Sequence, residues 1–144
     1  MKIQRINRDD REFVDVAYHN VSGSTLAKGE SVAFTTLAAS ADGISAVNVA
    51  ASNIYTFAGV ALADVADDDY GYARAYGLVD SVNIFATGTS TTIAIGVAMG
   101  PAISAVGFGS AGDTETFGPL VSMTIIGAAI QSPGGYSNAF VRAL

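Results

Sequence analysis

Three consecutive aspartates, Asp67–Asp69, stand between two stretches, 59–62 and 72–76, that have the pattern of buried β-strands. Carboxylates bind calcium and act as general bases, so this acidic stretch is the first candidate for chemistry. A calcium loop places its acids on alternate residues followed by a glycine, so that each ligand points at one ion. Neighbouring side chains diverge in an extended chain. The spacing therefore favours a solvated hairpin tip with Gly71, and a cation shared with Asp64 is the alternative.

Few other residues could do chemistry. His19 is the single histidine, it precedes a turn, and no G-x-S-x-G elbow accompanies any serine, so the pattern favours a surface histidine over a triad base. Asp113 and Glu115 lie in a glycine-rich stretch where solvation is the default. The chain has no cysteine and no phosphate-binding Gly-Lys-Ser/Thr. These patterns predict no catalytic residue, no cofactor and no metal ligand, and hence no enzyme.

One enzyme family provides the alternative reading. VADDDYG resembles the Asp-x-Asp-Tyr motif of trimeric dUTPases, and GFGSAG (107–112) resembles their glycine-rich phosphate motif. The resemblance implies that Asp67 or Asp69 orients water, Tyr70 backs the uracil and Ser110 contacts phosphate. The chain departs from that family because it lacks a Gly-Arg-Ser-Ser stretch and an arginine–glutamine pair. A triphosphate site with no arginine or lysine nearby lacks the charge to hold its ligand.

Composition bounds the architecture. The 144 residues fit one domain, half of them are hydrophobic, and only 14% are charged. A small domain with so few charges hides part of its surface against partners. No apolar run reaches the roughly 18 residues of a membrane-spanning helix. The N-terminus also lacks the apolar core of a secretory signal. Composition therefore predicts assembly with partners and no membrane insertion.

Charge is distributed unevenly along the chain. Residues 1–11 hold four of the seven basic residues and two aspartates, which gives +2. The remainder holds three basic and eleven acidic residues, which gives −8, and the two parts sum to the net charge of −6. An acidic body repels nucleic acid, whereas a basic arm is attracted to an acidic surface. We therefore expect a binding arm at 1–11 whose contact residues are Lys2, Ile3, Gln4, Arg5, Ile6, Arg8 and Arg11, and a frayed, soluble terminus is the alternative.

The remaining sequence has the pattern of short strands joined by turns. Alternation after Phe13, turn residues at 20–24 and an Asp42–Gly43 turn all indicate β-structure. Residues 45–56 could be strand or loop, and the Ala-rich stretch 94–105 favours strand plus turn over helix because of its glycines and Pro101. Further strands are predicted at 31–35, 82–85, 91–98, 120–126 and 139–144, with long loops at 107–119 and 131–138.

Two predicted strands carry small residues on one face. Val60 and Leu62 alternate with glycine and alanine, and Tyr72, Arg74 and Tyr76 alternate with Ala73, Ala75 and Gly77. Small faces allow another backbone to approach closely, so we expect them to pack between subunits. We further expect the bulky face to lie at a subunit boundary, where Arg74 pairs with Asp80 or with one of Asp67–Asp69, and a solvent-exposed face is the alternative.

The order of these blocks resembles the small cement, or decoration, proteins of tailed double-stranded DNA phage capsids. The matching blocks, in order, are NVSGSTLAKGESVAF (20–34), the Asp42–Gly43 turn, GVAL (59–62) and YGYARAYGLV (70–79). The resemblance spans roughly residues 12 to 100. It implies a β-tulip or small β-barrel body, residues 12–144, with the extended N-terminal arm 1–11. It also implies a homotrimer on the outer capsid surface, bound to the major capsid protein and stabilising the shell against internal DNA pressure.

Overall fold

The computed structural model describes residues 12–36, 42–50, 52–85, 92–102, 107–110, 123–127, 130–131 and 134–143. Within these ranges the chain is mainly β, with one short 3-10 turn and no α-helix, and its main sheet closes into rings. The prediction of a mainly β, small-barrel body is confirmed. The arm, residues 1–11, lies outside the described residues.

The elements follow in the order β1 (Val14–Asn20), β2 (Ser31–Phe34), β3 (Ser45–Asn48), η1 (Ile54–Thr56), β4 (Phe57–Ala61), β5 (Tyr70–Phe85), β6 (Thr92–Ile93), β7 (Ala98–Pro101), β8 (Phe108–Ser110), β9 (Met123–Ile125), β10 (Ile130–Gln131) and β11 (Gly134–Arg142). The strands are short, as the frequent turn residues predict, except for β5 and β11. β6 and β10 form a separate two-stranded sheet.

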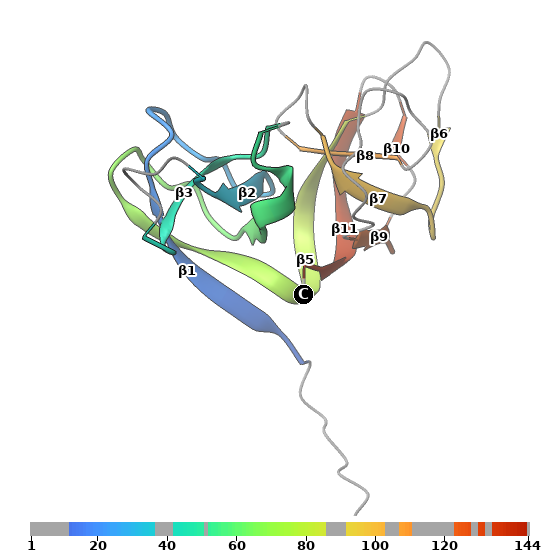
Figure 1. The fold of residues 1–144 in the computed structure, drawn as a ribbon. Helices are drawn as coiled ribbons and strands as arrows, with labels where there is room; N and C mark the ends of the chain where they lie inside the picture. Colours follow the sequence, from blue (N-terminus) through green and yellow to red (C-terminus); the bar gives the residue numbers. More distant parts are fainter. Residues whose placement is uncertain are drawn as a thin grey trace, which may run out of the picture.

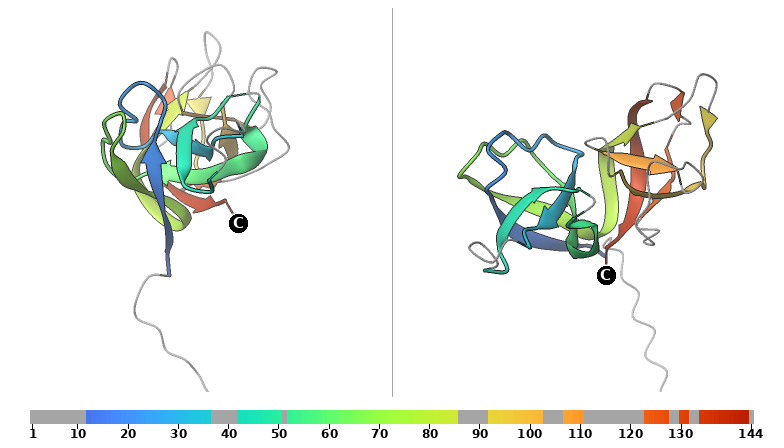
Figure 2. Two further views of the ribbon diagram at one scale, coloured as in Figure 1. Left: turned by 60° about the vertical axis from the view of Figure 1, so that its left-hand side comes forward. Right: turned by 45° about the horizontal axis from the view of Figure 1, so that its top comes forward.

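The main sheet forms two closed rings that share β5. Among the described strands, the first ring runs β1–β3–β2–β4–β5 and returns to β1, and the second runs β5–β11–β9–β7–β8 and returns to β5. One edge of β5 pairs first with β1 and then with β11, while the other edge pairs first with β4 and then with β8. The rings stand side by side as two lobes that meet along β5 (Figure 1, Figure 2).

A bulge lets β5 serve both rings. Its partner β11 places Ala139 opposite Val79 but Ser137 opposite Val82, so β5 holds one residue more than β11 at this point. Asp80 and Ser81 of β5 thus lie opposite the single residue Asn138 of β11, and Ser81 has a positive φ of 61°. The bulge shifts the inward positions from odd to even residues and bends the strand. The sequence predicted two strands here, one around 72–77 and one at 82–85, whereas the structure has the single strand β5.

Each ring has its own buried cluster. The first contains Tyr18 and Leu26 surrounded by small residues such as Ala46, Ala61 and Ala73. The second contains larger side chains from β5, β7, β8, β9 and β11, and it extends to the facing sides of β2 and β4. The phenyl groups of Phe57 on β4 and Phe108 on β8 pack edge to face, with 5.7 Å between their centres. This contact joins the two lobes.

The strand faces made of glycine and alanine line the interior of one chain, whereas the sequence pattern predicted that they pack between subunits. Ala61, Ala73 and Ala75 are fully or almost fully buried within a single chain, because they line the inside of the ring and its junction. A Cβ on Gly59 would stand 2.3 Å from the carbonyl oxygen of Arg74 on the next strand. The expectation that these faces pack between subunits was wrong, because a narrow ring already requires small residues on its inner surface.

Other boundaries also differ from the sequence prediction. The stretch 131–138 was expected to be a loop, but β11 begins at Gly134 and pairs there with Phe85. The strand expected at 91–98 is interrupted at Gly96, whose φ of +86° belongs to a turn. Glycines attract a loop prediction, yet neighbouring strands can draw them into a sheet.

Candidate functional site

The acidic stretch forms the tight turn that leads into β5. The Asp69 N–H donates to the Ala66 carbonyl at 3.2 Å, and Asp68 takes the left-handed φ of 66°. Aspartate tolerates that conformation better than most residues. The turn ends beside β1, where Asn20 and Asp68–Asp69 exchange backbone hydrogen bonds of 2.8 Å. The prediction of an exposed hairpin tip is confirmed, although Gly71 belongs to β5 and not to the turn.

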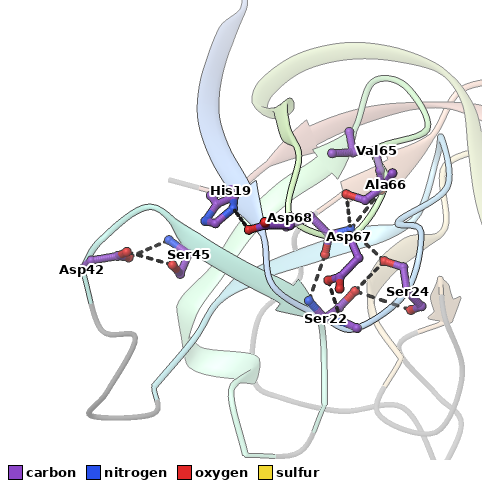
Figure 3. Close-up of polar contacts among 11 residues, drawn as sticks. His19, Ser22, Ser24, Asp42, Ser45, Val65, Ala66, Asp67 and Asp68 are labelled. Carbon is purple, nitrogen blue, oxygen red and sulfur yellow. Dashed lines mark hydrogen bonds and ion pairs between the residues drawn. The ribbon is translucent and has the colours of Figure 1, made fainter.

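Two of the turn's carboxylates, those of Asp67 and Asp68, bind groups of neighbouring segments of the chain (Figure 3). Asp67 Oδ1 accepts the Gly23 N–H at 2.8 Å, and Asp68 Oδ1 lies 2.9 Å from Nε2 of His19. Asp64, a few residues earlier, accepts the Lys28 N–H at 2.8 Å. Each carboxylate thus satisfies a donor of a neighbouring turn or strand, as capping aspartates do.

Asn20 fixes the position of the acidic turn. Its side chain is completely buried, and Nδ2 donates to the carbonyl oxygens of Ser24, Val65 and Ala66 at 2.7, 2.9 and 3.0 Å. Its Oδ1 accepts the Ser22 N–H at 3.0 Å. One amide therefore ties the 20–24 turn to the acidic turn, and a buried polar group in this position has all its bonds made.

The polar side chains of this region do not gather around one point. In the ranges that the structure describes, no three histidine, aspartate or glutamate side chains come close enough to hold a metal ion. His19 stacks on Tyr70, with 4.6 Å between ring centres, and its side chain is only 19% exposed. It is thus more buried than the predicted surface histidine, because β1 and β5 enclose it.

The predicted Asp42–Gly43 turn is present, and it leads into β3. Gly43 has a φ of +80°, and the Asp42 carboxylate accepts the N–H groups of Ser45 and Ile44 and the hydroxyl of Ser45. These donors lower the pKa of Asp42 from its ordinary value to about 2, with the backbone N–H of Ser45 making the largest contribution.

A row of aromatic and charged side chains occupies the outer surface of β1, β5 and β11. Alternation places Tyr70, Tyr72, Arg74 and Tyr76 outward, and Tyr70 and Tyr72 are 71% and 63% exposed. The Tyr76 ring contacts that of Phe140 on β11 edge to face at 5.2 Å. We call this row the outer ladder: Phe13, Tyr70, Tyr72, Arg74, Tyr76 and Phe140.

Arg74 is held within the chain. Its Nε and one terminal nitrogen donate to the two carboxylate oxygens of Asp15 at 2.7 and 3.0 Å, and the other terminal nitrogen donates to the Leu78 carbonyl. The guanidinium also lies 4.5 Å from the centre of the Phe13 ring. Hydrogen bonding to Asp15 is the main cause that raises the pKa of Arg74.

This arrangement confirms one prediction about the triplet and corrects another. Tyr72, Arg74 and Tyr76 do share one face, with alanines buried opposite. The acid that pairs with Arg74 is Asp15, however, and not Asp80 or Asp67–Asp69. Sequence reasoning missed Asp15 and Phe13 as partners, although a lone acid in an otherwise apolar strand was the available signal.

The two motifs of the dUTPase alternative lie far apart in the chain's fold. Tyr70 and the aspartates stand at the start of β5, whereas Ser110 ends β8, which pairs with β5 near its far end at Ile84. The first ring carries one motif and the second ring carries the other. A single chain does not bring them together.

No protein-family model matches the chain, and no curated protein matches it. Among the described residues, the structure contains no helix long and apolar enough to span a membrane. The predicted arm residues, Lys2 to Arg11, lie outside the described ranges.

Proposed function

We propose that this chain is a structural, non-enzymatic decoration protein of a tailed phage capsid. In this proposal it binds the major capsid protein on the outer surface of the virion shell as a homotrimer and stabilises the shell against internal DNA pressure. The resemblance of residues 20–79 to the cement proteins motivates it. A ring-forming β body of this size is the fold that the resemblance implies.

The outer ladder is the observation that carries the proposal. Three members of the ladder, Phe13, Tyr70 and Tyr72, are large apolar side chains that are strongly exposed in the described residues, and the exposed Val14 and Ile44 lie on β1 or beside it. Exposed aromatic groups of this kind are typical of protein interaction surfaces. The chemistry-bearing groups, in contrast, are occupied in turns.

The basic arm supports the same proposal because it joins the body at the ladder. Residue 11 is followed directly by Glu12 and Phe13, and Phe13 is a member of the ladder. An arm with a charge of +2 and the apolar residues Ile3 and Ile6 could order on an acidic shell surface. The proposed contact with the shell therefore includes both arm and ladder.

The experiment is co-sedimentation with capsid shells of the phage whose genome encodes this chain. We expect stoichiometric binding by the wild type and strongly reduced binding by Arg5→Glu/Arg8→Glu. Lys28→Glu, a charge reversal on the body outside the arm and the ladder, serves as the control. Absence of wild-type binding to mature shells would overturn the proposal.

A second assay separates the structural protein from the nucleotide pyrophosphatase. We expect no release of pyrophosphate from dUTP with magnesium and no rise in melting temperature. Turnover that is abolished by Asp67→Asn or by Asp69→Asn would reverse the choice in favour of the enzyme.

A further inference from the structure

One edge of β1 is open over most of its length. β5 pairs with β1 from Val14 to His19, but on the opposite edge β3 pairs only with His19 and Asn20. The His19 N–H donates to Ile44 on the β3 side, whereas the Asn20 N–H donates to Asp69 on the β5 side. Every second residue of a strand points to the same edge, so Ala17 and Asp15 direct their N–H and C=O groups to the same edge as His19. β3 does not extend far enough along this edge to pair with them. In the described part of the chain no strand pairs with them there.

This edge lacks the features that protect exposed edges. Natural edge strands carry lysine, proline or inward-pointing charges that discourage pairing with another strand. The sequence here is Phe-Val-Asp-Val-Ala-Tyr, and its one charge, Asp15, is neutralised by Arg74. Phe13 and Val14, at the start of the edge, are 58% and 45% exposed. An open, apolar and neutral edge of this kind is suited to accept an added strand.

We propose that the open edge of β1 binds the basic arm, within residues 2–8, of a second copy of this chain as an added strand. The proposal deepens the homo-oligomer part of the proposed function, on which it rests. The backbone of the arm would pair with the neighbouring subunit, which leaves side chains of the added strand to contact the shell. If each copy binds the arm of the next copy, the contact is head-to-tail. Such a contact closes into a ring when the rotation between subunits permits.

Charge complementarity favours the arm as the occupant. Acidic residues lie near the His19 end of β1: Asp42 on the β3 side, and the acidic turn Asp67–Asp69 on the β5 side, where Asp68 pairs with His19. The body as a whole carries −8, so a second acidic body edge is repelled, whereas residues 1–11 carry +2. Seven extended residues span about 23 Å, which exceeds the roughly 17 Å of edge from Val14 to Tyr18.

The direction of β1 favours a second copy over the chain's own arm. A Cβ on Gly77 would stand 2.8 Å from the Glu12 carbonyl oxygen, so at residue 12 the chain still runs beside β5. To reach its own edge, the arm would have to reverse between Arg8 and Glu12. That stretch, Arg-Asp-Asp-Arg-Glu, lacks the glycine of the favoured two-residue hairpin turns.

The test uses the full chain and its oligomeric state at micromolar concentration, measured by light scattering. Ala17→Pro removes an N–H group on the open side and is expected to abolish the oligomer, whereas Ala17→Ser keeps that group and the oligomer. Arg5→Glu/Arg8→Glu is expected to dissociate the oligomer, and Lys28→Glu is not. An oligomer that survives both Ala17→Pro and the arm reversal would overturn the proposal.

Amide hydrogen exchange provides a measurement that does not depend on the folding of the proline variant. The Ala17 amide of the wild type is expected to be protected, and to lose its protection in Arg5→Glu/Arg8→Glu. A synthetic peptide of residues 1–11 should restore protection in that variant. Fast exchange of Ala17 in the wild-type oligomer would overturn the proposal, as would a monomer with a protected Ala17 amide, because the arm would then bind its own edge.

These outcomes are distinguishable from failure of the proposed function. An oligomer that is independent of the arm but still binds shells would overturn only the strand exchange. An arm-exchanged oligomer that ignores shells would overturn only the decoration role.

Discussion

The two rings that share β5 have five described strands each, yet they are filled differently. The first encloses Tyr18 and Leu26 among alanines, whereas the second packs Ile84, Met99 and Phe108 against further large side chains. The same strand thus presents Ala73 to one ring and Ile84 to the other. β5 therefore contributes small residues where Tyr18 and Leu26 already fill the ring, so small residues need not indicate a subunit contact.

Removal of a large side chain from the second ring should have the greatest effect. Phe108 is fully buried and contacts Phe57 of the other lobe. Phe108→Ala is expected to lower the free energy of unfolding by about 3–5 kcal/mol, because it leaves a cavity where the lobes meet. Urea denaturation measures the change. A loss below about 1 kcal/mol would mean that the lobes pack independently of this residue.

Enlargement of a small side chain in the first ring should come next. Ala73→Leu is expected to cost about 1–3 kcal/mol, because the narrow interior has no room for three more carbon atoms. Ala17, which pairs with Tyr72 on the neighbouring strand and is exposed, provides the matched control in Ala17→Leu. Equal melting temperatures of the two variants would contradict the claim that the first ring has no room for a larger side chain at residue 73.

The outer ladder allows stability and assembly to be separated. Arg74→Ala removes bonds to Asp15 and Leu78 within the chain, so we expect a loss of about 1–3 kcal/mol in folding stability. Tyr72→Ala removes a mostly exposed ring and should leave folding stability almost unchanged. If Tyr72→Ala weakens the oligomer or shell binding while remaining as stable as the wild type, the ladder is an interface. Equal binding by both variants and the wild type would mean that the outer ladder is a solvent-exposed surface and not an interface.

The ionisation of Tyr18 reports whether the interior of the first ring excludes water. Burial and the nearby charge of Glu30 raise the pKa of Tyr18 to about 12, and in the described structure its hydroxyl has no hydrogen-bond partner. Because the folded-state pKa lies above the ordinary value of 10, the stability linked to this group is lost as pH rises from about 10 through 12. We expect Tyr18→Phe to change stability at pH 7 by less than about 1 kcal/mol and to reduce the alkaline loss. Identical alkaline unfolding of both proteins would show that Tyr18 is accessible to water.

The Asp42 turn should have the smallest effect. Its pKa of about 2 lies below the ordinary 3.8, so its contribution is present above about pH 4 and is lost as pH falls towards 2. Asp42→Asn should therefore narrow the difference in melting temperature between pH 5 and pH 2. An unchanged acid dependence would show that the turn forms without the ionised carboxylate.

Local features were predictable because they depend on neighbouring residues. Turn chemistry located the 20–24 and Asp42–Gly43 turns and the acidic tip, and period-two alternation placed Tyr72, Arg74 and Tyr76 on one face. The absence of any helical period indicated the β class. In each case the signal lies within a few residues of the structure that it specifies.

The tertiary structure alone decided how those elements meet. It joined 70–85 into one strand through the bulge at Ser81, turned the alanine faces into the inside of a ring, and paired Arg74 with Asp15, 59 residues away. Alternation states which residues share a face but not what covers that face. Contacts between distant segments depend on which strands become neighbours, and no short stretch of this sequence encodes that choice.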